Sequence, residues 1–318
     1  MKVQAASVSL AGMEITVWLP EEQSVALMGG LPDGFRADVW AGSPAFPDSA
    51  GDVEIVVPSF DAQDAELARL RELPRLKVVQ LESVGVDWVR PHIPDGVILC
   101  NARGAYDKAV AEWVVAVALS HFRNLPAFER ARQLGTWDFA HTGTLEGKTA
   151  LIVGFGSIGS ELASMLHVFG VDTIGVARTA RDGVHGVDEL PDLLPRADLV
   201  VLTLPGTAAS RHLVDTRFLG TMRDGALLVN AGRGEVVDTD ALLAELQNTR
   251  LFAALDVTDP EPLPDGHPLW RAPGLQLTPH VAGSNGTAMA KAMRLTKAQL
   301  IRYAAGETLL NVVGPDGY

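Results

Sequence analysis

Six short apolar runs follow one another at nearly even spacing between residues 149 and 278, and they constrain the fold more than any other feature of this sequence. Their starts, at positions 149, 173, 198, 226, 251 and 275, are 24 to 28 residues apart. That spacing is too long for hairpins and matches a strand, a crossover helix and the next strand. Each run is apolar on both faces, which is typical of parallel strands buried between helices. The pattern predicts an α/β fold with a doubly wound parallel sheet of about six strands, at 149–153, 173–177, 198–204, 226–230, 251–257 and 275–278.

The first hundred residues alternate in the same manner, but less regularly. Two longer helices are expected elsewhere, at 106–122, which is rich in Ala and Val, and at 286–305. The length of 318 residues agrees with about two domains. The apolar runs of the first hundred residues predict strands at 14–19, 37–40, 53–57, 76–81 and 97–100, with a helix at 61–71.

The charge balance and the single cysteine exclude several classes of protein. Lys and Arg number 26 against 39 Asp and Glu, a formal charge of −13, which argues against binding to nucleic acid or to an anionic membrane. One cysteine, Cys100, rules out an intrachain disulfide and a cysteine zinc cluster, and the histidines lack paired ligand spacing, so no metal is expected. The sequence has no apolar stretch of about 20 residues and no secretory pattern at its start, so we expect a cytoplasmic protein.

The first of the six runs leads directly into a glycine-rich turn, Gly154, Gly156 and Gly159, and then into a helical stretch at 160–168. A G-x-G-x-x-G pattern is weak evidence alone, but a preceding strand and a following helix are the context that a dinucleotide site requires. The first glycine permits a tight turn, the second lets the backbone approach a diphosphate, and the third allows close packing of helix and strand. The alternative is a glycine turn without a ligand, and the context favours the dinucleotide site.

Three polar residues follow the ends of three successive predicted strands, where open α/β sheets bind ligands. Arg233, Glu261 and His280 follow the fourth, fifth and sixth runs. An acid–base imidazole, a carboxylate to hold it and a guanidinium for an anionic substrate form a complete set for alcohol and ketone chemistry beside a nicotinamide. Each has a plainer explanation, as a structural histidine, a solvated loop acid or a surface arginine, but their joint placement favours catalysis.

Short motifs along nearly the whole chain carry a resemblance to a known family. They are VGVD at 84–87, NARG at 101–104, VAE at 110–112, LEGK at 145–148, GFGSIG at 154–159, LP at 204–205, NAGRG at 230–234, LDV at 255–257, EP at 261–262 and TPH at 278–280. With these motifs in this order, the sequence resembles the D-isomer-specific 2-hydroxyacid dehydrogenase family, which includes glyoxylate/hydroxypyruvate reductases and phosphoglycerate dehydrogenases. The resemblance implies a Rossmann-type dinucleotide-binding domain at 101–284 and a discontinuous, flavodoxin-like α/β substrate domain at 1–100 that 285–318 completes. It also implies a homodimer formed largely through the nucleotide domains.

The family mechanism, carried over to the matching positions, gives each polar group a role. Arg233 binds the substrate carboxylate and polarises the 2-keto oxygen, a task that suits a planar guanidinium. The backbone N–H groups of Val84 and Gly85 bind the other side of that carboxylate. His280 exchanges a proton with the substrate oxygen, and Glu261 fixes its tautomer and favours the imidazolium.

The same resemblance implies a set of cofactor-binding residues around the glycine turn and the strand ends. Among them, Asp256 is expected to meet the carboxamide or the nearby ribose of the cofactor. Trp137 matches a family position that reaches towards the substrate pocket in some members, and a plain core or interface tryptophan is an equal alternative. The expected cofactor-binding residues are Gly154, Phe155, Gly156, Ser157, Ile158, Gly159, Arg178, Thr179, Arg181, Leu204, Pro205, Ala231, Gly232, Asp256 and Gly283.

The end of the second strand departs from the commonest family pattern. NAD-specific members usually carry Asp at the position of Ala177, where it accepts hydrogen bonds from the adenosine ribose. Here Arg178, Thr179 and Arg181 follow Ala177, and they offer two guanidiniums and a hydroxyl to a 2′-phosphate that an acid would repel. We therefore expect NADP(H) to be favoured over NAD(H); the alternative is that both arginines only face solvent.

The expected activity is hydride transfer between NAD(P)H and a small 2-keto acid or D-2-hydroxy acid. Pro279 argues against formate dehydrogenases, which usually have Gln before the active-site histidine. The 318 residues leave no room for the regulatory domain of many phosphoglycerate dehydrogenases, so a glyoxylate/hydroxypyruvate-type reductase is favoured and a phosphoglycerate-type dehydrogenase is the alternative. A nucleotide-sensing, corepressor-like binding protein is the rival from another class, and turnover distinguishes the two.

Overall fold

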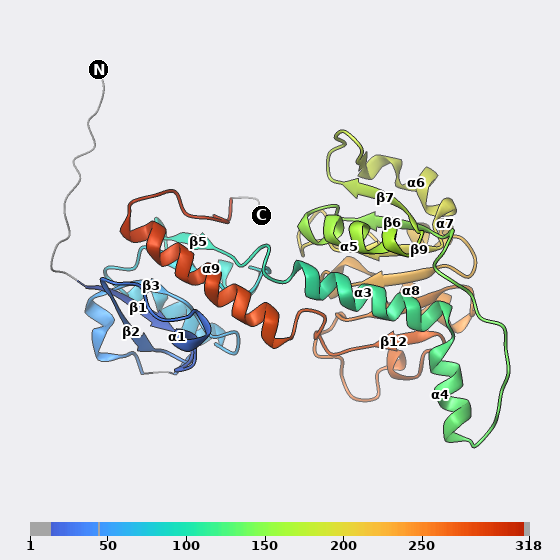
Figure 1. Ribbon diagram of the computed structural model, residues 1–318, viewed down its shortest axis with the longest axis horizontal. Helices are drawn as coiled ribbons and strands as arrows, with labels where there is room; N and C mark the ends of the chain where they lie inside the picture. Colours follow the sequence, from blue (N-terminus) through green and yellow to red (C-terminus); the bar gives the residue numbers. More distant parts are fainter. Residues whose placement is uncertain (1–13, 44, 315–318) are drawn as a thin grey trace. The chain divides into compact units, whose positions relative to one another are not determined.

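The computed structural model describes residues 14–43 and 45–314, which divide into two compact units (Figure 1). The first unit holds the described residues up to Ala105 and those from Met289 onward, and the second is Tyr106–Ala288. These limits lie four or five residues beyond the domain limits expected from the sequence. In the described part of the chain, no helix combines the length and the apolar character that a membrane crossing requires.

The first unit is built on a parallel five-stranded sheet with the order β2-β1-β3-β4-β5, the flavodoxin-like arrangement. Each predicted run coincides with one of these strands. β2 begins two residues earlier than predicted, because Phe35 already pairs with Ile15 at the start of β1. The strands are β1 (Ile15–Leu19), β2 (Phe35–Val39), β3 (Val53–Val56), β4 (Val78–Gln80) and β5 (Ile98–Cys100).

Helices cover both faces of this sheet. Alternate side chains of the strands enter two cores, with Trp18 and Leu67 in one and Val17 and Met293 in the other. The helix predicted at 61–71 is only partly confirmed, because α2 continues as a 3-10 helix, Ala68–Glu72. The next residue, Leu73, has an extended backbone because a proline follows it. The helices are α1 (Ser24–Leu27), α2 (Asp64–Leu67) and α9 (Gly286–Ala304), the last belonging to this unit from Met289 onward.

The segment after α9 returns to the edge of the same sheet. Val312 forms an antiparallel bridge with Cys100 at the end of β5. Tyr303 on α9 donates a hydrogen bond of 2.6 Å to Glu54 Oε2 on β3. The C-terminal part of the chain therefore completes the core and the edge of the unit that the N-terminal part begins.

The second unit contains a parallel seven-stranded sheet with the order β12-β11-β10-β9-β6-β7-β8. All six predicted strands are confirmed, and the seventh, β8, was not predicted because two residues give no periodic pattern. Two predicted runs extend two residues beyond their strands, since Leu204 and Val257 in the following loops are again apolar. The strands are β6 (Thr149–Val153), β7 (Asp172–Ala177), β8 (His185–Gly186), β9 (Leu199–Leu202), β10 (Leu227–Asn230), β11 (Phe252–Leu255) and β12 (Leu275–Leu277).

Helices on both faces explain why the central strands of this sheet are apolar on both faces (Figure 1). On β6, Leu151 packs in the core shared with α7 and α8, and Ile152 packs in the core shared with α3 and α5. The predicted doubly wound parallel fold is therefore confirmed. The helices are α3 (Asp107–Phe122), α4 (Leu125–Gln133), α5 (Ser157–Val168), α6 (Leu190–Leu193), α7 (Thr216–Thr221) and α8 (Thr239–Gln247).

α4 and the segment after it form an arm that the sequence did not predict. Figure 1 shows α4 projecting from the end of α3 away from the sheet, and none of the residues of α4 is buried. Leu134, Trp137 and Phe139 on the following segment are 81%, 95% and 76% exposed. The plain core alternative for Trp137 is therefore wrong in this chain.

Candidate active site

The predicted site residues of the second unit lie at the carboxyl ends of neighbouring strands. In sheet order, His280 follows β12, Asp256 follows β11, Arg233 follows β10, Leu204 follows β9, and the glycine turn follows β6. Because these strands are parallel, all of the residues share one edge of the sheet. The acid–base candidates gather towards β12 and the nucleotide candidates towards β7.

The glycine turn after β6 has the open backbone that a dinucleotide diphosphate requires. A Cβ on Gly154 (φ +103°) would lie 2.8 Å from a backbone carbonyl at the end of β9, and a Cβ on Gly159 would lie 3.1 Å from a β6 side chain. A Cβ on Gly156 would meet nothing nearer than 3.9 Å, so this side of the turn is open. α5 begins at Ser157, and none of the described side chains caps its N-terminus, which leaves its first N–H groups available to an anion. The turn therefore fits NAD(P).

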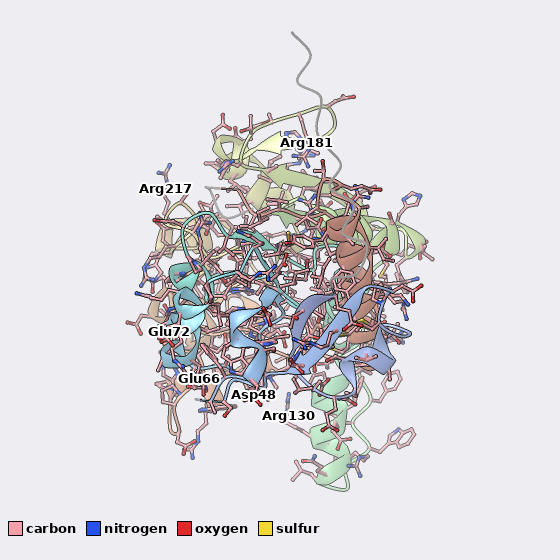
Figure 2. All side chains as sticks on the ribbon, turned by 90° about the vertical axis from the view of Figure 1, so that its left-hand side faces the viewer. Asp48, Glu66, Glu72, Arg130, Arg181 and Arg217 are labelled. Carbon is pink, nitrogen blue, oxygen red and sulfur yellow. The ribbon has the colours of Figure 1, made fainter. Side chains whose placement is uncertain are left out.

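The loop after β7 carries the two arginines expected to select the phosphorylated cofactor. Arg178 is exposed directly after the strand. Arg181, labelled in Figure 2, donates a hydrogen bond of 2.6 Å from Nη2 to the carbonyl of Phe155 in the glycine turn. The backbone of Arg181 also pairs in both directions with Val184, which closes a tight hairpin. Arg181 is thus tied to the turn, whereas Arg178 faces outward.

Arg233 sits in a loop whose backbone is fixed by the buried end of β10. Asn230 donates from Nδ2 to the carbonyl of Arg233 at 2.9 Å and accepts from the N–H of Gly232 at 3.0 Å. Arg233 Nη1 donates to the carbonyl of Gly232 at 2.8 Å. A Cβ on Gly234 would overlap the backbone of Thr258, so the Arg233 loop packs directly on the loop that leads to Glu261.

His280 and Glu261 form the pair that the sequence predicted. The distance from His280 Nδ1 to Glu261 Oε1 is 2.6 Å, and the two side chains are 41% and 38% exposed. Burial raises the pKa of Glu261, but the hydrogen bond and charge of His280, a backbone hydrogen bond from Thr258 and the charge of Arg233 together hold it below its ordinary value. An ionised carboxylate only accepts, so Nδ1 carries the proton of this hydrogen bond.

Asp256 is 3% exposed and its carboxylate is surrounded by the loop that carries His280. Oδ1 accepts from Thr278 Oγ1 at 2.6 Å and from the N–H of Val281 at 2.8 Å, and Oδ2 accepts from the N–H of Ala282 at 2.8 Å. The expected contact of Asp256 with the cofactor stays a prediction.

In the first unit, the loop after β4 presents the two amides predicted to bind a carboxylate. The carbonyls of this loop are engaged: Val84 accepts from Asn101 Nδ2 at 2.9 Å, and Gly85 accepts from Ser83 Oγ at 2.8 Å. Among the described residues, the N–H groups of Val84 and Gly85 donate to no protein acceptor. Consecutive amides without an acceptor are typical of an anion-binding loop.

The remaining predicted residues line the same strand ends of the second unit. A Cβ on Gly232 would lie 2.5 Å from the carbonyl of Leu204, so the loops after β9 and β10 touch backbone to backbone beside Ala231. The carbonyl of Pro205 accepts from Ser210 Oγ at 2.6 Å. A Cβ on Gly283 would lie 3.0 Å from the Tyr106 ring. Within the described residues, no group of three or more His, Cys, Asp or Glu is arranged to hold a metal ion.

Two residues that hold the Arg233 loop in place, Asn230 and Gly234, were not predicted as site residues from the sequence. Both belong to the NAGRG motif, which contributed only to the family resemblance. The signal for Asn230 is an amide at the end of an otherwise apolar buried run. Gly234 gives no signal, because its role depends on contact with a loop 24 residues further along the chain.

Comparison with known proteins identifies relatives of this chain. The family profile described as "D-isomer specific 2-hydroxyacid dehydrogenase, NAD binding domain" matches residues 115–282. A glyoxylate reductase from Thermofilum pendens is 33% identical over 264 residues, which cover 78% of this chain and 77% of that protein. A D-3-phosphoglycerate dehydrogenase from Mycobacterium tuberculosis is 33% identical over 275 residues, and these cover 83% of this chain but 51% of that protein.

Solved structures match over nearly the full length. The crystal structure of the NADPH-dependent glyoxylate/hydroxypyruvate reductase from Sinorhizobium meliloti, in complex with NADP and sulfate, aligns with a TM-score of 0.83 at 27% identity. The alignment covers 96% of this chain and 100% of that chain, and so it includes both units.

Proposed function

This chain belongs to the D-isomer specific 2-hydroxyacid dehydrogenase family and is an NAD(P)-dependent oxidoreductase acting on 2-hydroxy acids, and we propose that its own reaction is the reduction of glyoxylate or hydroxypyruvate by NADPH. The acid–base chemistry of the proposal rests on the 2.6 Å pairing of His280 with Glu261, on the edge of the sheet that also carries the glycine turn, and the substrate class rests on the glyoxylate reductases among the relatives. The charge of Arg233 acts on the same pair.

We assign binding of the cofactor to the strand ends from β6 to β10, together with Gly283 in the loop after β12. The amides at the start of α5, in Ser157, Ile158 and Gly159, suit the diphosphate. When bound, the nicotinamide supplies the hydride, and the protein supplies orientation and charge. The other residues of this proposed site are Gly154, Phe155, Gly156, Arg178, Thr179, Arg181, Leu204, Pro205, Ala231, Gly232 and Gly283.

Arg233 and His280 act on the substrate in this proposal. The Arg233 guanidinium binds the carboxylate and stabilises the negative charge that develops on the 2-keto oxygen. His280 donates the proton at Nε2 to that oxygen during reduction and takes it back during oxidation. Glu261 holds Nδ1 and offsets the charge of the imidazolium before the proton leaves. The amides of Val84 and Gly85 are our proposed second contact to the carboxylate.

The preference for NADPH rests on the loop after β7. Ala177 brings no acid near the adenosine ribose, and Arg178 is exposed directly after it. Arg181 supports this loop through the glycine turn, because its guanidinium donates to the carbonyl of Phe155. A 2′-phosphate therefore meets positive charge and no carboxylate at the strand end.

A homodimer is our proposed assembly, with the arm after α3 as its contact. Leu134, Trp137 and Phe139 expose apolar surface that a second copy of the chain would cover. The cytoplasmic location stays an expectation from the sequence.

The test is a panel of 2-keto acids followed at the nicotinamide absorbance, with NADPH and NADH in parallel. We expect the highest kcat/KM with glyoxylate or hydroxypyruvate and NADPH. A clear preference for phosphohydroxypyruvate supports the phosphoglycerate-type alternative instead. Tight NADPH binding without turnover on any member of the panel supports the nucleotide-sensing alternative.

A further inference from the structure

Two neighbouring strands of the second unit end in buried polar side chains that touch the loops of the catalytic candidates. Asn230 at the end of β10 is fully buried, and Asp256 directly after β11 is 3% exposed. The two are joined through the backbone, because the N–H of Asp256 donates to the carbonyl of Asn230 at 3.0 Å. Buried polar groups are costly unless they are paired, so their hydrogen bonds show what they hold in place.

Asp256 holds the loop of His280 on both sides of the imidazole. Its carboxylate accepts from Thr278 before His280 and from the amides of Val281 and Ala282 after it. Its backbone carbonyl accepts from the N–H of His280 itself at 2.7 Å. Four hydrogen bonds from one residue therefore fix the five-residue stretch that presents the imidazole.

The backbone of His280 needs such support. Its φ of +54° lies in the left-handed region, which residues with a side chain rarely adopt. This conformation sets the direction in which the side chain leaves the backbone, and it persists only where the surroundings determine it. The hydrogen bonds to Asp256 stabilise the backbone of His280 in this conformation.

Asn230 holds the Arg233 loop in place in the same way as Asp256 holds the His280 loop, but with fewer hydrogen bonds. Its side-chain amide donates to the carbonyl of Arg233 and accepts from the N–H of Gly232. The Arg233 loop thus has one buried side chain beneath it, as the His280 loop has.

We infer that Asp256 and Asn230 are positioning residues, Asp256 acting through His280 and Asn230 acting through Arg233. This inference rests on the proposed function, which gives the two side chains their tasks. It differs from the role that the sequence suggested for Asp256, a contact with the cofactor. The carboxylate already receives three protein donors, so its main partner is the His280 loop.

The isosteric variants Asp256→Asn and Asn230→Asp test the inference. An Asn at 256 offers one acceptor oxygen and one N–H₂ group in place of two acceptors, so the amide of Ala282 or the donors from Thr278 and Val281 lose their partner. An Asp at 230 turns an acceptor towards the carbonyl of Arg233, and the two oxygens repel. We expect each change to lower kcat/KM by about 10- to 100-fold, because small displacements of catalytic groups are costly.

Double-variant cycles distinguish positioning from a general loss of stability. Asp256→Asn added to His280→Ala should cost less than threefold, because the group it positions is already gone, while added to Arg233→Ala it should keep most of its effect. Asn230→Asp should behave the other way round. Equal losses in both backgrounds overturn the inference and indicate a structural role.

Cofactor affinity tests the competing role of Asp256. The dissociation constant of NADPH, measured by calorimetry, should change less than threefold in Asp256→Asn. A rise of tenfold or more, with hydrogen exchange of 278–282 as in the parent protein, overturns the inference in favour of a cofactor contact. If Asp256→Asn does not fold, Thr278→Val removes one of the three donors, and it should show the same coupling to His280→Ala with a smaller loss.

A readout without turnover separates this inference from the proposed function. Hydrogen–deuterium exchange of a peptide spanning 278–282 should accelerate at least tenfold in Asp256→Asn and stay unchanged in Asn230→Asp. If no 2-keto acid is reduced but exchange accelerates as expected, the proposed function fails and the positioning of the loop holds. If exchange is unchanged in Asp256→Asn, the inference fails whatever the activity.

Discussion

Replacing Gly234 with alanine should uncouple Arg233 from the His280–Glu261 pair. The new Cβ would overlap the carbonyl carbon and oxygen of Thr258 and would lie 2.8 Å from the N–H nitrogen of Asp259. Each of these atoms belongs to the backbone, so no side chain can turn aside to make room. Since real Cβ atoms keep at least 3.0 Å from such atoms, one of the two loops must retreat by about 1 Å. A displacement of this size between catalytic groups costs on the order of 10²-fold in rate.

The assay for Gly234→Ala is kcat/KM for the best 2-keto acid, together with the melting temperature and the dissociation constant of NADPH. We expect a loss of about 10²-fold in kcat/KM, with cofactor affinity retained, because the glycine turn after β6 is not touched. Gly220→Ala is the matched control: a Cβ at this exposed position in α7 meets nothing within 4 Å, so activity should be unchanged. Activity of Gly234→Ala within threefold of the parent protein would refute the close approach of the two loops.

Three further predictions concern charge. Burial and the nearby charge of Glu21 raise the pKa of Glu82 from 4.5 to about 7, so the folded state loses up to about 3 kcal/mol of stability as pH rises from 4.5 to 7. Glu82→Gln should therefore raise the melting temperature at pH 8 and leave it unchanged near pH 4.5. An equal shift of the melting temperature at both pH values contradicts this. Glu261→Gln should move the pH profile of reduction to lower pH, because the imidazolium of His280 loses its counter-charge; an unmoved profile means that another acid is the partner. Arg178→Ala should weaken the binding of NADPH about 10- to 100-fold and leave the binding of NADH unchanged. Arg181→Ala should weaken the binding of both cofactors, because Arg181 also holds the glycine turn. Calorimetry with each cofactor measures the difference.

The strands could be predicted because their burial leaves a direct mark on the sequence. Runs such as 150–153 are apolar at every position, since Leu151 and Ile152 face opposite cores that are both filled by helices. The runs at 226–230 and 275–278 each end in a polar residue where the chain leaves the core, and for this reason Arg233 and His280 could be placed at strand ends.

The features that were not predicted depend on contacts between distant segments or on exposure. No residue of α4 is buried, so the apolar runs that mark the buried elements do not include it. The hydrogen bond from Arg181 to Phe155 joins residues 26 apart, and sequence spacing does not indicate it. The left-handed backbone of His280 is likewise set by Asp256, which lies on the neighbouring strand end rather than beside it in sequence.

The most direct test of the account is the rate of NADPH oxidation by hydroxypyruvate in the parent protein and in His280→Ala, measured side by side with the NADPH dissociation constant of each. The account predicts turnover by the parent protein and a rate lower by about 10²–10⁴-fold in His280→Ala, at unchanged NADPH affinity. Turnover of His280→Ala within tenfold of the parent protein contradicts the proton transfer assigned to His280.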